Sequence, residues 1–183
     1  MVSLSATGCA LDQGGGDEPS VSPAPQPAPQ RPQELALAGK QSADMCKLLL
    51  PEQQVQVGVE RSDPAPAGSA PGCIWLSVPG VKPDVTIELE ALDMGFEEAV
   101  GRAGEPFPET AASYEIDGFK AEQGQEGAGL ESLGCRVDVD VAQGQTLEVF
   151  YSPTLSGTVT NQDMCAKAKQ AAEFAVTNLQ AQG

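Results

Sequence analysis

Five cysteines are the residues of this 183-residue chain whose possible chemistry is best defined by type and spacing. They are Cys9, Cys46, Cys73, Cys135 and Cys165. The last four are 27, 62 and 30 residues apart, so no C-x-x-C pair is present to form a zinc knuckle or a thioredoxin-like redox motif. Four cysteines in one folded region are an even set, which indicates two structural disulfides and an oxidising compartment. The alternative is that some of the four are buried apolar thiols.

Four cysteines allow three pairings, and their spacing does not select one of them. We favour Cys46 with Cys73 and Cys135 with Cys165, because each bridge would tie the start of a predicted helix to the start of a nearby predicted strand. Each bridge would close a loop of about 30 residues, which in the chain-entropy model stabilises a fold by about 3 kcal/mol.

Cys9 stands apart from the other four. The residues Thr7-Gly8-Cys9 resemble the bacterial lipobox, in which the cysteine thiol is diacylated and becomes the mature N-terminus. Ala6 stands where Leu is usual, and residues 1–8 contain no Lys, Arg or long apolar segment. We therefore interpret residues 1–9 as the remnant of a truncated signal peptide with a lipobox, and Cys9 as the lipidated residue. The alternative is a cytoplasmic protein with a surface cysteine.

The remaining chemistry points away from catalysis and from metal binding. The chain contains no histidine, which removes Ser-His-Asp and Cys-His catalysis and histidine metal ligands. Asp138, Asp140 and Glu148 are expected close together on a hairpin, where they could bind a hard cation or set up a raised pKa for acid-base chemistry. We favour the simpler interpretation of a solvated acidic face, because an acidic protein shows such faces everywhere and no Asp-x-Asp-x-Asp-Gly loop is present. Trp75 could line a ligand pocket, although a single Trp beside a cysteine is more often part of the core. We expect no enzyme, no catalytic residue, no metal site and no cofactor.

The charge balance excludes nucleic acid as a partner. The chain has 26 acidic and 10 basic residues, a formal net charge of -16, which repels a phosphate backbone. No window of the sequence contains the roughly 20 consecutive apolar residues of a membrane-spanning helix.

Residues 10–41 are predicted to form a disordered tether. Residues 11–33 contain almost no large apolar side chain, and Pro, Gly and Gln predominate. Such a composition favours extended polyproline II and flexible coil over helix or sheet. We therefore predict one folded domain over residues 42–183.

Hydrophobic periodicity within this domain changes between helical and strand spacing. It predicts helices over 42–50, 51–57, 93–100 and 161–179, and strands over 73–78, 85–91, 114–119, 135–141 and 146–151. The polar residues of 60–72 and the Gly- and Glu-rich stretch up to Gly129 are predicted loops. Gly101 and Gly104 are expected to stop the third helix, and Asn161 or Asp163 to cap the last. We expect an α+β fold, an antiparallel β-sheet with the N-terminal and C-terminal helices packed on one face and two disulfides.

The motifs of the domain resemble the actinobacterial envelope lipoproteins that carry the domain of unknown function 3558. They are Cys46-Lys47-Leu48-Leu49, Pro51-Glu52, Gly72-Cys73-Ile74-Trp75, Gly134-Cys135-Arg136-Val137-Asp138-Val139 and Asp163-Met164-Cys165-Ala166-Lys167-Ala168. This resemblance implies an exported, lipid-anchored domain with both disulfides formed, and it carries no established activity.

We expect a non-enzymatic binding or scaffold module on the extracytoplasmic face of the cell membrane, anchored through a lipid on Cys9. Its partner would be an unknown envelope protein or a small ligand, and its acidic surface favours basic partners or simply solubility. The alternative is a carrier in the cell envelope whose sheet and helices enclose an apolar ligand such as a lipid.

Overall fold

The computed structural model describes residues 31–35, 37–80, 82–102, 110–128, 131–155 and 158–182, and only the backbone of residues 126–128 and 131–133. The chain divides into two units, Met1–Gln30 and Arg31–Gly183. The described residues all belong to the second unit. The predicted leader with Cys9 and residues 10–30 of the predicted tether lie outside them.

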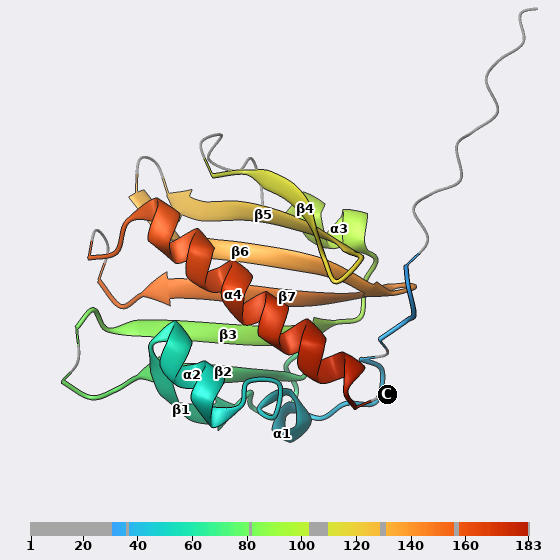
Figure 1. The fold of residues 1–183 in the computed structure, drawn as a ribbon, viewed down its shortest axis with the longest axis horizontal. Coiled ribbons are helices and arrows are strands. Elements are labelled where there is room, and N and C mark those ends of the chain that lie inside the picture. The colour runs from blue at the N-terminus through green and yellow to red at the C-terminus, as the bar shows by residue number, and fades with distance from the viewer. Residues whose placement is uncertain are drawn as a thin grey trace, which may run out of the picture. The chain divides into compact units, whose positions relative to one another are not determined.

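A single antiparallel sheet organises the described residues. Seven strands follow the order β1-β2-β3-β7-β6-β5-β4 (Figure 1). They are β1 (Val59–Pro64), β2 (Gly72–Ser77), β3 (Val85–Leu92), β4 (Ala112–Ile116), β5 (Phe119–Ala128), β6 (Glu131–Ala142) and β7 (Gln145–Pro153). The helices are α1 (Ser42–Met45), α2 (Pro51–Val57), α3 (Phe96–Arg102) and α4 (Asn161–Gln180). The expected α+β architecture with an antiparallel sheet is confirmed.

Helix α4 lies diagonally across one face of the sheet and contacts β5, β6 and β7 (Figure 1). Half of its buried stripe consists of alanines, whose small side chains let the helix approach the strands closely. The stripe consists of Met164, Cys165, Ala168, Ala171, Ala172, Ala175, Val176 and Leu179. Opposite it, alternate residues of the central strands, such as Val137 and Val149, are fully buried. The core of the molecule therefore lies between α4 and the sheet.

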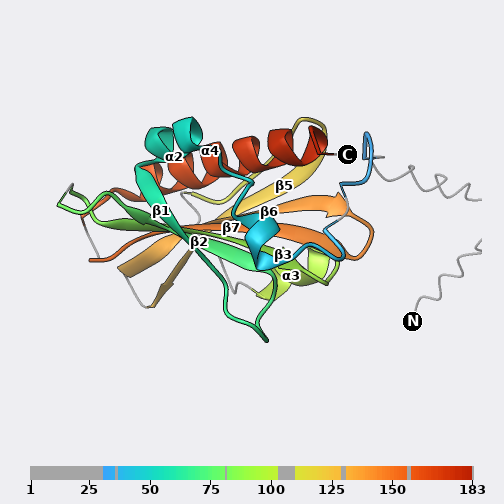
Figure 2. The same ribbon diagram turned by 90° about the horizontal axis from the view of Figure 1, so that it is seen from below.

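The helices are not confined to one face of the sheet. Helix α2 lies beside α4, and the two are joined by hydrogen bonds from Asn178 Nδ2 to Gln53 Oε1 (2.7 Å) and from Lys167 Nζ to Gln56 O (2.6 Å). Helix α3 lies on the opposite side of the sheet (Figure 2). The expectation of helices packed on one face is therefore too simple, because the β3–α3 connection crosses to the other face.

Two predicted boundaries of helices are corrected. Helix α3 spans Phe96–Arg102, so Gly101 lies within the helix and does not stop it. The helix begins at Phe96 and not at the predicted residue 93. The Thr146 hydroxyl donates a hydrogen bond to the Met94 carbonyl oxygen (3.1 Å), which holds the segment before the helix against β7. At α4 the N-cap is Thr160, whose side chain accepts a hydrogen bond from the Asp163 backbone N–H, not Asn161 or Asp163.

Two predicted loops are strands. Strand β1 begins at Val59 and occupies the first part of the predicted loop 60–72. It is an edge strand in which only Val59 is buried, so its sequence shows no alternating pattern. Strand β5 occupies the Gly- and Glu-rich stretch, paired on both sides, with Phe119 and Ala121 buried. It begins after a two-residue turn in which Asp117 (φ 49°) and Gly118 (φ 84°) both have positive φ, as a hairpin turn that matches strand twist requires.

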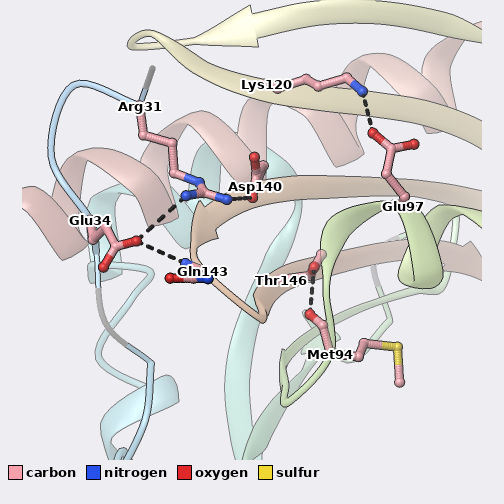
Figure 3. A network of polar contacts seen from close by, with 8 residues as sticks. All are labelled: Arg31, Glu34, Met94, Glu97, Lys120, Asp140, Gln143 and Thr146. Carbon is pink, nitrogen blue, oxygen red and sulfur yellow. Dashed lines mark hydrogen bonds and ion pairs between the residues drawn. The ribbon is translucent and has the colours of Figure 1, made fainter. Parts of the chain in front are cut away.

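Residues 31–35 and 37–40, which we call the strap, bind the end of the sheet at the β6–β7 turn. The Arg31 guanidinium pairs with Asp140 (2.8 Å) and Glu34 (3.5 Å), and Glu34 accepts the Gln143 backbone N–H (3.0 Å) (Figure 3). The contacts of Arg31 with Asp140 and of Glu34 with Gln143 each join residues that are 109 positions apart in the sequence. The strap therefore ties the N-terminal end of the described chain to its C-terminal hairpin.

Apolar packing reinforces the strap. Leu35 and Leu37 are 6% and 3% exposed, the Leu35 N–H donates to Val141 O (2.8 Å), and the Leu37 N–H donates to Gln145 Oε1 (2.6 Å). Residues 31–41 belong to the predicted tether, but the strap is packed against the sheet. The reason is that Leu35 and Leu37 supply the large apolar side chains that residues 11–33 lack.

Two disulfides join helical segments to strands. Cys46, the residue that ends α1, is bonded to Cys73 in β2, and Cys135 in β6 is bonded to Cys165 in α4. The favoured pairing is confirmed. One bridge fixes α1 against the β1–β2–β3 side of the sheet, and the other fixes α4 against the middle of the sheet.

If the strap belongs to the fold, replacing Leu35 and Leu37 by Ala will lower the free energy of unfolding by about 2 kcal/mol for each residue. Urea denaturation of the oxidised protein measures this loss. Leu155→Ala is the control, because Leu155 is 64% exposed and its truncation should change stability by less than about 0.5 kcal/mol. Equal, small effects for all three substitutions would mean that the strap is merely part of a tether.

Candidate functional site

The face of the sheet turned away from α4 is polar and partly open. Its residues lie in cross-strand rows over β2, β3 and β7, where Glu90 is opposite Glu148, and Glu88 lies between Ile74 and Phe150. We call this surface the polar sheet face. It consists of Ile74, Leu76, Thr86, Glu88, Glu90, Glu148, Phe150 and Ser152, all of them partly exposed. On the other face of the same strands, the intervening residues are buried beneath the helices.

Glu88 and Glu90 are the residues of this face whose ionised forms are disfavoured by their surroundings. Partial burial, followed by repulsion from Glu148, raises the pKa of Glu88. Partial burial, followed by repulsion from Glu88, raises the pKa of Glu90, and the Arg102 guanidinium offsets part of this shift. Within the described residues, no Lys or Arg nitrogen lies within ion-pair distance of either carboxylate. Negative charge therefore accumulates on β3 without direct neutralisation.

The neighbouring part of the face is neutralised by arginines. Arg136 and Asp138 on β6 are 6% and 1% exposed and form an ion pair (Nε–Oδ2, 2.9 Å). Arg102 of α3 pairs with Glu148 (2.9 Å), and Arg136 lies 3.9 Å from the same carboxylate. The sequence analysis placed Asp138 on a solvated face. It is instead buried, because Arg136 compensates its charge on the side of the sheet that α3 covers.

The three carboxylates singled out from the sequence do not converge on one point. Asp138 and Glu148 lie opposite each other on β6 and β7, but each pairs with arginine. Asp140 pairs with Arg31 of the strap (Figure 3). Among the described residues, no group of three His, Cys, Asp or Glu side chains could hold a metal ion. These carboxylates serve the fold through ion pairs.

Trp75 lies in the core and not in this site. It is fully buried on the face of β2 that points toward the helices. Its indole Nε1 has no hydrogen-bond partner among the described residues. This placement agrees with the core interpretation of Trp75 and separates it from the polar sheet face.

Sequence reasoning did not single out Glu88 and Glu90. The alternation of Thr86, Glu88 and Glu90 with apolar residues identified them only as outward-facing on a half-buried strand. These two carboxylates stand out because β3 lies between β2 and β7 in the strand order of the sheet. Neighbouring strands on both sides partly bury the carboxylates, whereas an edge strand would leave them more exposed to water. Periodicity contains no information about that order.

The polar sheet face combines charged and apolar side chains. It offers two carboxylates without a direct cationic partner, flanked by the apolar side chains of Ile74 and Phe150. No helix of the described part is long and apolar enough to cross a membrane.

Replacing Arg136 by Leu should destabilise the protein by about 3 to 5 kcal/mol, because it leaves the buried charge of Asp138 without its ion-pair partner. Chemical denaturation of the oxidised protein measures this change. Arg61→Leu is a matched control, since Arg61 and Asp63 form an exposed pair (3.7 Å) expected to contribute less than about 1 kcal/mol. A similar small effect for both would show that the buried pair is not important for stability.

Glu88→Gln should raise Tm by a few degrees at pH 7 and leave it nearly unchanged at pH 4. The pKa of Glu88 is raised in the folded state, so the native protein binds the proton more tightly than the unfolded chain. Stability is therefore lost as pH rises from the unfolded pKa through the folded pKa, and the amide removes this loss. Calorimetry between pH 4 and pH 8 tests the expectation, with exposed Glu98→Gln as control. A lower Tm for Glu88→Gln at pH 7 would contradict it.

Comparison of the chain with the curated proteins and with the solved structures finds no match. One family model matches residues 4–178, which include all five cysteines, the strap and the whole sheet. Its description is a protein of unknown function, DUF3558. Because the match covers nearly the whole chain, the protein belongs to the DUF3558 family.

Proposed function

We propose that this protein is an exported, non-enzymatic binding or scaffold module, held at the extracytoplasmic face of the cell membrane by a lipid on Cys9. The observation that carries the proposal is the pairing of four of the five cysteines in two disulfides. Disulfides of this structural kind persist in oxidising compartments and are rare in the cytosol. Cys9 is the cysteine that remains for another role, and Thr7-Gly8 precede it as in a lipobox.

The position of the strap fits a tethered domain. Arg31 is the first described residue, it pairs with Asp140 of the sheet, and it lies 22 residues after Cys9. At about 3.1 Å per residue, an extended linker of that length would let the domain reach about 70 Å from its anchor. A spacer of this reach suits a module whose partner lies beyond the membrane surface.

The side chains of the fold support binding over catalysis. The chain has no histidine to act as a general base, and Asp138, Asp140 and Glu148 are held in ion pairs with arginines. The polar sheet face offers charge and apolar contact area without a nucleophile and base in contact. These features are those of a surface that recognises a partner.

The alternative function is a carrier of an apolar ligand such as a lipid. The packing of α4 disfavours it, because fully buried side chains fill the space between this helix and the sheet. A ligand could instead occupy a hollow of about 490 Å³ between α2, the start of β3 and the first turns of α4, which Val57, Tyr151 and Val159 help to line. This hollow is where a carrier would be tested first.

Intact mass is the direct test of the proposed function. The protein would be expressed with its native upstream region, recovered from membranes and alkylated without reduction. We expect a chain that begins at Cys9, carries added acyl mass and has no alkylated cysteine. A Cys9→Ser variant should lose the acyl mass and leave the membrane fraction while keeping both disulfides. A soluble, unprocessed chain with alkylated thiols would overturn the proposal.

A further inference from the structure

The two faces of the sheet are covered unequally by the described residues. Helices α2 and α4 lie over one face, whereas α3 on the other side contacts β6 and β7 (Figure 2). The surface of β2 and β3 on that other side has no described helix over it, and its side chains remain partly exposed. A half-open sheet face that combines charge with apolar side chains is typical of an interaction surface.

We propose that the polar sheet face is the docking surface for a basic, amphipathic segment of an envelope protein, whose Lys or Arg side chains reach Glu88 and Glu90 with their charged ends and pack their aliphatic stems on Ile74 and Phe150. The proposal deepens the proposed function, since it names the surface and the partner class of that binding module. It rests on the binding role and not on the lipid anchor.

Charge complementarity identifies the partner as cationic. Glu88 and Glu90 are neighbours on one face of β3, and no basic side chain of the described chain pairs with them. Partial burial disfavours the ionised forms of both residues, with repulsion from Glu148 adding to it at Glu88 and repulsion from Glu88 adding to it at Glu90. A Lys or Arg brought to this face by a partner would therefore relieve a cost already present in the free protein. An anionic partner would increase that cost, and so would a second copy of this chain, whose net charge is -16.

Apolar contacts define the spacing of the partner. Ile74, Glu88 and Phe150 lie side by side on three adjacent strands, whose backbones are about 5 Å apart, so an apolar residue stands on either side of Glu88. A Lys or Arg satisfies both requirements, because its aliphatic stem can pack on Ile74 or Phe150 while its charged end reaches Glu88. An extended segment that alternates basic and apolar residues would place such a side chain at every second position.

The test uses the full chain with both disulfides intact and a synthetic peptide that alternates Lys and Val. As the peptide is added, the amide chemical shifts of Ile74, Glu88, Glu90 and Phe150 should change and then reach a plateau. The affinity should fall as the salt concentration is raised. The variant Glu88→Gln/Glu90→Gln should bind about tenfold more weakly, the effect of removing two partly exposed charge pairs.

Matched controls separate docking from general attraction of a polycation to an acidic protein. Glu52→Gln/Glu173→Gln removes the same charge from exposed positions on α2 and α4, on the helix side of the sheet, and should leave the affinity within about twofold. A peptide that alternates Glu and Val should not bind. Equal weakening by both double variants, shifts spread over the helix side, or no binding would overturn this docking surface. None of these results would alter the mass test of the anchor, so the two proposals fail independently.

Discussion

The close approach of α4 to the sheet is the constraint on which the remaining structure depends. An alanine-rich stripe brings the helix down onto the strands, and the Cys135–Cys165 bridge fixes it there. Because this contact fills one face of the sheet, the opposite face must carry most of the charge of the strands. The polar sheet face and the buried Arg136–Asp138 pair both follow from that division of the sheet into a packed side and a polar side.

Charge on the polar side is distributed in two ways that have different consequences. Toward β6, arginines neutralise the carboxylates, and the resulting ion pairs hold α3 and the hairpin in place. Toward β3, carboxylates lie beside one another without such partners, which stores an unfavourable interaction in the free protein. Structural proteins tend to remove such costs, whereas recognition surfaces retain them because a partner can relieve them.

The sequence predicts those parts of the fold that produce strong local patterns. The β6–β7 hairpin, with Val137, Val139 and Val141 alternating with charged residues, and the long stripe of α4 are found where periodicity places them. Strands β1 and β5 escape prediction because backbone pairing to neighbours holds them, and their Gly, Glu and Ser residues show little alternation. One local signal could have revealed β5. Asp117-Gly118 is a typical two-residue hairpin turn, and it indicates that a strand follows at Phe119.

The candidate site was predictable only in part. Carboxylates could be placed on outward faces, but the burial of Asp138 depends on Arg136 and on α3, which comes from a distant part of the sequence. The prominence of Glu88 and Glu90 depends on the strand order, which brings β3 next to β7 across about 60 residues. Pattern analysis identifies faces of strands, and only tertiary structure determines which faces meet.

The two disulfides join cysteines that are consecutive in the folded unit, first with second and third with fourth. For a chain that emerges N-terminus first from a ribosome or a translocation channel, the first pair can close before the third cysteine appears. The native bridges are thus those favoured by order of emergence, and oxidation need not pass through mismatched pairs that an isomerase must later undo. The strap contacts residues 140–145, so it can dock only after the β6–β7 turn has emerged.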